Sequence, residues 1–113
     1  MQQETQSQAP KGSFIYNTTI QVAWAIHDIW IEWMRARQIP DIMATGCFTG
    51  YNFVRILEVD ETEGATYAVQ YYVDSKADYN RFTELHANRF RAEAMANWGN
   101  NFIGFNTLME VVN

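Results

Sequence analysis

The order in which two residue periodicities follow one another is the feature that most constrains the fold of this chain. Four segments alternate from residue to residue and are rich in β-branched and aromatic side chains, which predicts strands. They are residues 14–23, 47–59, 65–73 and 102–112. Segments 25–38 and 75–97 instead carry apolar residues at helical spacing. The order β-α-β-β-α-β predicts an α+β, ferredoxin-like fold, a four-stranded antiparallel sheet with both helices on one face.

Proline and glycine set the expected ends of the helices. Pro40 should stop the first helix, because the residue before a proline disfavours α geometry. Asp41 would then cap a short helical turn that Gly46 closes. Ser75 should cap the second helix and Gly99 should end it. The buried stripes are expected to be Ile26, Ile29, Trp30 and Trp33 in the first helix, and Tyr79, Phe82, Leu85, His86 and Phe90 in the second.

Two helices cover only one face of such a sheet, so strand parity decides what the other face carries. In the last strand, we expect the even-numbered residues from Phe102 to Glu110 on the uncovered face and Ile103, Phe105 and Met109 opposite them. The uncovered face would then mix apolar and polar side chains. Those that could bind a small ligand are Asn17, Gln21, Gln70, Tyr72 and Asn106. The parity of Arg55 stays open, because its strand alternates imperfectly.

A half-apolar sheet face of this kind can pack on the same face of a second copy. The two sheets of a two-fold dimer would then close into an α/β barrel, and we expect a homodimer on this ground. The 4 Trp, 6 Tyr and 7 Phe favour it, since aromatic residues are enriched at interfaces. The alternative is that the face stays in solvent and the aromatic residues only fill a small core.

Length and composition bound the remaining possibilities. The 113 residues suit a flexible tail, 1–13, and a single domain, 14–113. The first residues lack the apolar core of a signal peptide and no run is long enough to span a membrane, so a cytoplasmic setting is expected. The lone Cys47 excludes an internal disulfide, and the net charge of −5 argues against nucleic acid as a partner.

Only two side chains suggest acid–base chemistry near neutral pH. His27 lies beside the apolar stripe of the first helix, and His86 lies within that of the second. Each imidazole could serve a catalytic site, but each is more often a hydrogen-bonded structural residue. Neither has a second His or a Cys at ligand spacing, so no metal site is expected, and no glycine-rich loop indicates a cofactor.

Several runs of residues resemble a known family. They are Asp28 to Phe48, including Glu32-Trp33-Met34, Ile39-Pro40 and Met43-Ala44-Thr45-Gly46; Tyr67-Ala68-Val69-Gln70-Tyr71; His86-Ala87; and Leu108-Met109-Glu110-Val111-Val112. Together they resemble a small bacterial family classed as a domain of unknown function, within the ferredoxin-like dimeric α/β-barrel superfamily. The resemblance covers residues 14–112. It implies the fold and a dimer, and it implies no chemistry.

The chain also departs from the pattern of that family. The resemblance implies His where this chain has Gln38, Pro where it has Asn88, and a further His where it has Ala94. A catalytic role that depended on those imidazoles would be lost here, which weakens the case for an enzyme.

Three hypotheses for function remain open. The first is a non-catalytic homodimer that binds a small molecule between its sheets or serves as an interaction module. The second is a cofactor-independent enzyme, monooxygenase-like or isomerase-like, that uses His27 or His86; many dimeric α/β barrels are such enzymes, and this is analogy only. The third is a structural or regulatory partner that acts through the tail and an exposed helix.

Overall fold

The structure, a computed structural model, describes residues 13–113, and its four strands form one antiparallel sheet. The strands are β1 (Phe14–Ala23), β2 (Gly50–Ile56), β3 (Gly64–Val73) and β4 (Phe102–Glu110). Their order across the sheet is β2-β3-β1-β4, so the two central strands are β3 and β1. This confirms the predicted ferredoxin-like sheet. Except for Ser13, the segment predicted as a flexible tail lies outside the described residues.

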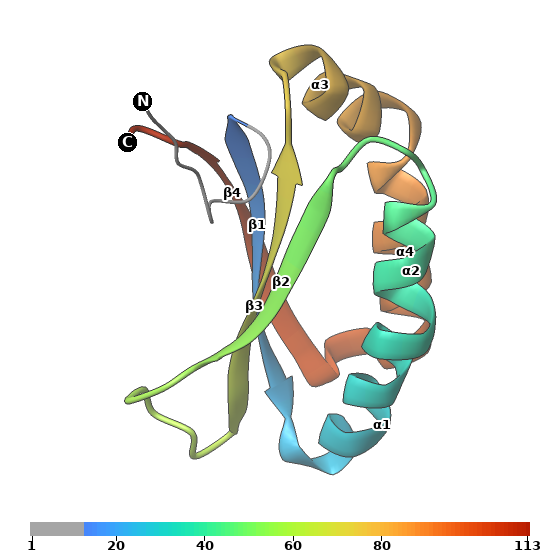
Figure 1. Ribbon diagram of the computed structural model, residues 1–113. Helices are drawn as coiled ribbons and strands as arrows, with labels where there is room; N and C mark the ends of the chain where they lie inside the picture. Colours follow the sequence, from blue (N-terminus) through green and yellow to red (C-terminus); the bar gives the residue numbers. More distant parts are fainter. Residues whose placement is uncertain (1–12) are drawn as a thin grey trace.

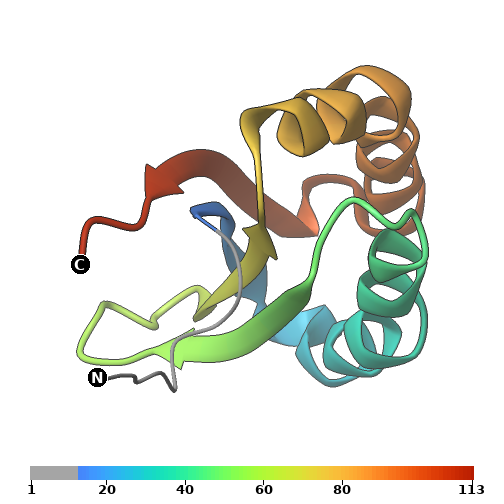
Figure 2. The same ribbon diagram turned by 45° about the horizontal axis from the view of Figure 1, so that its top comes forward.

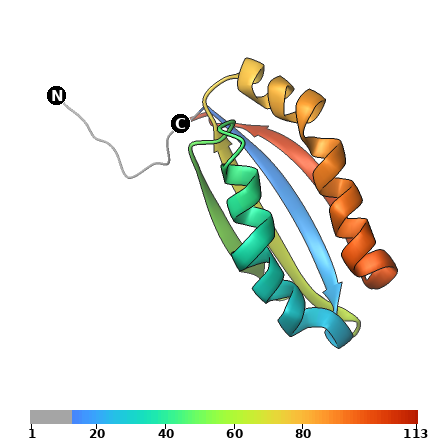
Figure 3. The ribbon, with the colours of Figure 1, turned by 90° about the vertical axis from the view of Figure 1, so that its right-hand side faces the viewer.

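Two helical arms cover a single face of this sheet (Figures 1 and 3). The first arm consists of η2 (Trp24–Ile26), α1 (His27–Trp33), the π-helical segment η3 (Met34–Gln38) and α2 (Ile39–Met43). The second consists of α3 (Lys76–Leu85), α4 (Ala87–Trp98) and the short η4 (Gly99–Asn101). With its top tilted forward, the sheet curves beside the helices, and no helix of residues 13–113 covers its other face (Figure 2).

Pro40 does not stop the first helix, contrary to the prediction. The backbone N–H of Ile39 donates to the Met34 carbonyl, five residues back, so the turn before Pro40 is a wider π turn. Pro40 therefore falls in the first turn of α2, where its missing N–H costs little. Gly46, with a φ of 77°, closes the arm as expected.

The second helix is interrupted, although the sequence predicts it as continuous. Ser75 caps it as expected and accepts a hydrogen bond from the backbone N–H of Asp78. His86, with φ −128° and ψ −33°, leaves helical geometry and separates α3 from α4. The break turns α4 down along the sheet (Figure 1). Two residues predicted to be buried, Ile29 in the first arm and Leu85 in the second, are exposed.

Strand register places the side chains on the two faces of the sheet. Directly paired residues of neighbouring strands point to the same face. Tyr16 of β1 packs on Phe82 of α3, with 5.6 Å between ring centroids. The even-numbered residues of β1 therefore lie on the sheet face under the helices. The prediction for β1 and β3 is thereby confirmed. Arg55, which pairs with the buried Tyr67, also lies on the helix side.

The parity predicted for β4 is wrong. Asn106 pairs with Thr18 and Gly104 pairs with Ile20, so the even-numbered residues of β4 lie under the helices. Ile103 and Phe105 consequently lie on the uncovered face. We call this surface the open face; by register, its members are Ile15, Asn17, Thr19, Gln21, Gly50, Asn52, Val54, Ile56, Thr66, Ala68, Gln70, Tyr72, Ile103, Phe105, Thr107 and Met109.

The core beneath the helices is largely aromatic. Phe82 is 1% exposed and contacts Phe48 and Phe90, with ring centroids 4.9 and 6.0 Å away. Trp30 of α1 is 2% exposed and meets Phe53 of β2 edge to face. Aromatic pairs of this geometry add to the area that they bury, and they hold both arms on the same sheet face.

Gly64, at the start of β3, lies close against the backbone of β1. A Cβ there would lie 1.9 Å from the carbonyl oxygen of Val22, whereas a Cβ at Gly50 would meet only Tyr72 at 3.6 Å. We expect Gly64→Ala to lower the free energy of unfolding by about 3 kcal/mol, because β1 and β3 must separate. Gly50→Ala is the matched control and should change it far less. Chemical denaturation followed by circular dichroism measures both, and equal effects would contradict the close approach of β3 to β1 at Gly64.

Candidate functional site

A cavity of about 460 Å³ lies between the two helical arms and the β1–β4 side of the sheet. That volume is typical of small-molecule sites. The first arm supplies Trp30, Trp33, Met34, Gln38 and Ile42; α4 and η4, with neighbouring α3, supply Phe82, Ala87, Phe90, Arg91, Ala94, Met95, Gly99 and Asn100; the strands supply Tyr16, Thr18, Ile20, Val69, Tyr71, Phe102, Ile103, Gly104 and Asn106. We call this space the inter-arm cavity.

Gln38 lines the inter-arm cavity, and the oxygen of its amide is unpaired behind that wall. Its Oε1 is buried and has no hydrogen-bond partner among the described residues. The Nε1 of Trp98 is also buried and unpaired, and its ring packs edge to face on Trp33, which lines the cavity. A buried polar atom that neither protein nor water satisfies costs roughly 1–3 kcal/mol.

The phenols of the inter-arm cavity remain neutral. Burial raises the pKa of Tyr16, and it raises the pKa of Tyr71 still further. Among the residues that line the cavity, only Arg91 carries a formal charge, and it donates to the Asn88 side chain from an exposed position. The wall is thus mostly apolar, with uncharged hydroxyl and amide groups, which suits a neutral ligand.

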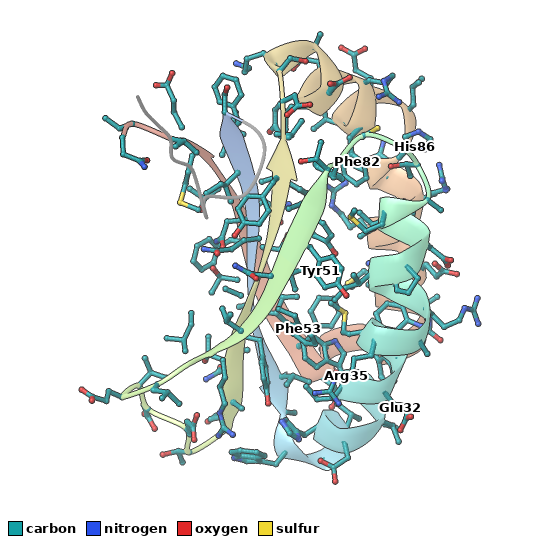
Figure 4. All side chains as sticks on the ribbon, viewed as in Figure 1. Glu32, Arg35, Tyr51, Phe53, Phe82 and His86 are labelled. Atoms are coloured by element: carbon teal, nitrogen blue, oxygen red, sulfur yellow. The ribbon has the colours of Figure 1, made fainter. Side chains whose placement is uncertain are left out.

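A second cavity, of about 500 Å³, opens between α1 and the β2–β3 edge. His27 lies in it and contacts two neighbours: its Nδ1 is 2.8 Å from Asp28 Oδ1, and its Nε2 is 2.6 Å from Tyr67 Oη. Phe53 and Arg35 extend from facing elements at this edge (Figure 4). We call this space the edge cavity; Ile31, Glu32, Val54 and Arg55 complete its lining.

The contacts of His27 fix how protons can move through it. A carboxylate only accepts, so Nδ1 donates its hydrogen to Asp28. When the imidazole carries one hydrogen, Nε2 is then the acceptor and takes a hydrogen bond from the Tyr67 hydroxyl. The side chain of Asp28 is fully exposed, whereas Tyr67 is buried. The three residues form a hydrogen-bonded chain from the edge cavity to the solvent.

His86 lies apart from both cavities. It is half-buried rather than largely buried as predicted, because it occupies the break between α3 and α4 (Figure 4). Its Nδ1 contacts the Arg89 guanidinium. Desolvation lowers the pKa of His86, and the positive charges of Arg89 and Arg81 lower it further. A neutral imidazole held beside two cations is not brought together with any other predicted site residue.

Four of the five predicted ligand-binding residues share the open face. Asn17 pairs with Gln70 across β1 and β3, and its side-chain amide donates to Thr19 Oγ1 at 3.0 Å. The Tyr72 hydroxyl accepts from Asn52 Nδ2 at 2.7 Å. Gln21 lies on the same face. The fifth, Asn106, lines the inter-arm cavity on the other side of the sheet, so its predicted grouping with them is wrong.

Sequence reasoning did not identify Gln38 or Tyr67 as site residues. Trp30, Met34 and Ile42 are buried and share one stripe of the arm with the half-buried Gln38, the four residues recurring every four positions. That signal was detectable, but the expected stop at Pro40 cut the stripe short. Tyr67 is 40 residues from His27, and no spacing along the chain points to their contact.

Residues 13–113 show no cluster of His, Cys, Asp and Glu side chains that could hold a metal ion. Over the same range, no helix has the length and apolar character needed to cross a membrane.

Comparison with known proteins agrees with the fold. Residues 13–112 match the sequence profile of a domain of unknown function, DUF4286. No match was found among curated proteins.

Solved structures of low sequence identity share the architecture. A dimeric ferredoxin-like protein from an uncultured marine organism aligns with a TM-score of 0.66 and 13% identity, over 89% of this chain and 96% of its own. An ethyl tert-butyl ether d (EthD) family protein from Bacillus halodurans C-125 aligns with a TM-score of 0.62 and 12% identity, over 88% and 99%. A dimeric ferredoxin-like protein of unknown function from Thermobifida fusca YX aligns with a TM-score of 0.56 and 12% identity, over 96% and 100%.

Proposed function

The chain belongs to the DUF4286 family of domains of unknown function, and on that premise we propose that it is a homodimer that binds a small, neutral molecule in the inter-arm cavity of each subunit. The observation that carries the ligand half of this proposal is the mostly apolar inter-arm cavity of about 460 Å³, whose lining includes the uncharged polar residues Thr18, Gln38 and Asn106. The dimer half rests on the open face.

The open face carries more apolar surface than a solvated sheet face needs. Phe105 is 64% exposed and Ile103 is 71% exposed, and both lie on the edge strand β4. Val54 of β2 is exposed at the opposite edge. Large apolar side chains exposed at both edges of one sheet face favour an interaction site, and a two-fold axis would let the same surface cover itself. Two of the similar structures are described as dimeric.

The polar residues of the open face fit the same proposal. Asn17, Gln21, Gln70 and Tyr72 lie on the central strands between the apolar edges. In a face-to-face dimer they would line the interior between the two sheets, where their amides and hydroxyl would fix the alignment of the copies or hold a polar ligand group. Asn17 is already mostly buried within one subunit.

A cofactor-independent enzyme is a second candidate, favoured by one specific observation. The edge cavity contains the hydrogen-bonded chain Tyr67–His27–Asp28, which can pass a proton between a bound molecule and solvent. Arg35 lines the same cavity and has no ion pair among the described residues. Such a site suits proton transfer on a small acid. His86 offers no comparable arrangement.

We predict that Phe105→Glu dissociates the dimer. In the dimer the new carboxylate would have to be buried against the second subunit, which strongly disfavours association. Sedimentation velocity should find the wild type at twice the 13.1 kDa of one chain and the variant at 13.1 kDa. Leu85→Glu is the matched control, since Leu85 on α3 is 66% exposed, and it should leave the dimer intact. A monomeric wild type would overturn the dimer proposal.

Filling the inter-arm cavity should abolish ligand binding. Ala94 faces the cavity from α4, so Ala94→Trp places a bulky ring inside it. We expect this variant to lose at least about tenfold in affinity for N-phenyl-1-naphthylamine, a neutral fluorescent probe, in a fluorescence titration. Ala92→Trp, at an exposed position of the same helix, should bind like the wild type. Binding that is unaffected by Ala94→Trp would place the probe elsewhere and contradict the proposal.

The enzyme candidate predicts that His27 is essential for proton transfer. We expect the wild type to exchange the methylene hydrogens of phenylpyruvate for deuterium faster than buffer alone, as followed by proton NMR. His27→Gln and Tyr67→Phe should each lower this rate by about a hundredfold, while His86→Gln should leave it unchanged. A wild-type rate equal to that of buffer, or an equal loss in His86→Gln, would count against the enzyme.

A further inference from the structure

We infer that the inter-arm cavity takes a neutral amphipathic molecule, an apolar body with one polar end, and that Asn106 holds the polar end at the mouth of the cavity. The inference rests on the proposed function and adds the chemical class and the orientation of the ligand. It follows from how polar and apolar residues are distributed between the buried and the exposed parts of the lining.

The inner end of the inter-arm cavity is apolar. The lining residues that the structure buries are all aliphatic or aromatic, among them Ile20, Trp30, Val69, Phe82 and Phe90. An apolar group that enters this end leaves water and packs against these side chains, which favours binding. A polar group would lose its hydration there, so the inner end suits the body of a ligand and disfavours its polar end.

The mouth of the cavity lies between α4 and β4 and carries polar side chains. The exposed residues of the lining all come from α4, η4 and β4, and they are Arg91, Met95, Asn100, Ile103, Gly104 and Asn106. The guanidinium and two of the amides of the lining are thus at the solvent end. A polar ligand group at this end keeps its contact with water and gains these side chains as hydrogen-bonding partners.

Asn106 is the side chain of the mouth that is best placed to hold a polar end. It pairs with Thr18 of β1, so its side chain stands under the helices, where it lines the cavity. Its amide is exposed and makes no side-chain hydrogen bond within residues 13–113. Asn100 lies instead in the irregular η4, and Arg91 donates to Asn88. A strand positions a side chain more precisely than an irregular segment does, and an amide can both donate to and accept from a hydroxyl.

The charges around the mouth favour a neutral end. The lining contains no carboxylate, so a cationic end would meet only the like charge of Arg91. An anionic end would gain little from Arg91, because this guanidinium is exposed to solvent, and the net charge of −5 on the chain opposes an anion. A hydroxyl meets the hydrogen-bonding groups of the mouth without either cost.

Four probes that share a 2-phenylethyl body test the inference. Propylbenzene has an apolar end, 3-phenyl-1-propanol a hydroxyl, 3-phenylpropionate a carboxylate and 3-phenylpropylammonium a cation. Isothermal titration calorimetry at pH 7 would measure their affinities for the wild type, for Asn106→Leu, and for Asn97→Leu as a control at an exposed position of α4 outside the lining. Leucine has nearly the size of asparagine and removes its polar atoms.

We expect the wild type and Asn97→Leu to bind 3-phenyl-1-propanol about fivefold more tightly than propylbenzene, and more tightly than either charged probe. Asn106→Leu should lose this preference through weaker binding of the alcohol. It should keep its affinity for propylbenzene, which also shows that the variant is folded.

Three results would overturn the inference and leave the proposed cavity in place: equal wild-type affinity for the alcohol and propylbenzene, an unchanged preference in Asn106→Leu, or tighter binding of a charged probe than of the alcohol. If none of the four probes binds, the ligand half of the proposed function fails together with it.

Discussion

The register of β1 with its two neighbours is the constraint on which the rest of the structure depends. Directly paired residues point to the same face, and β1 pairs with both β3 and β4, so one strand assigns side chains across most of the sheet. Tyr16 shows which of the two sheet faces lies under the helices, because its ring packs on Phe82 of α3. A shift of β1 by one residue would move Tyr16 out of the aromatic core and bring Asn17 beneath the helices, while Tyr71 of β3 kept its place.

The fold could be predicted from the sequence because periodicity and strand order decide it, and those signals are local. The parity of β4 could not be predicted, because both of its faces contain apolar residues. Hydrophobicity alone favours burying Ile103 and Phe105 over Gly104 and Asn106, yet the register does the opposite. The prediction that the more apolar side of a strand faces the helices assumes that the uncovered face meets water. Its failure at this strand is what a sheet would show if that face were built to meet protein.

The residues of the candidate sites could be predicted only where the residue type alone indicates a possible catalytic role. An imidazole stands out in any sequence, so His27 was found, but its partner Tyr67 comes from another element and needed the fold. Gln38 is an ordinary residue made unusual by its surroundings. The π turn carries the helix past Pro40, so that half-buried Gln38 lies between the buried Met34 and Ile42 on one stripe of the arm. Neither the π turn nor the orphaned oxygen has a local sequence signature.

The two halves of the proposed function meet at β4, and strand geometry keeps them separable. Asn106 and Phe102 line the inter-arm cavity, whereas Phe105 and Thr107 belong to the open face, because successive side chains of a strand point to opposite sides. A substitution at Phe105 therefore changes the surface offered to a second copy without removing a side chain that lines the cavity. If a monomeric Phe105→Glu variant also lost the ligand, the cause would lie in the β4 backbone, which both faces share, and the cavity would depend on the dimer for its shape.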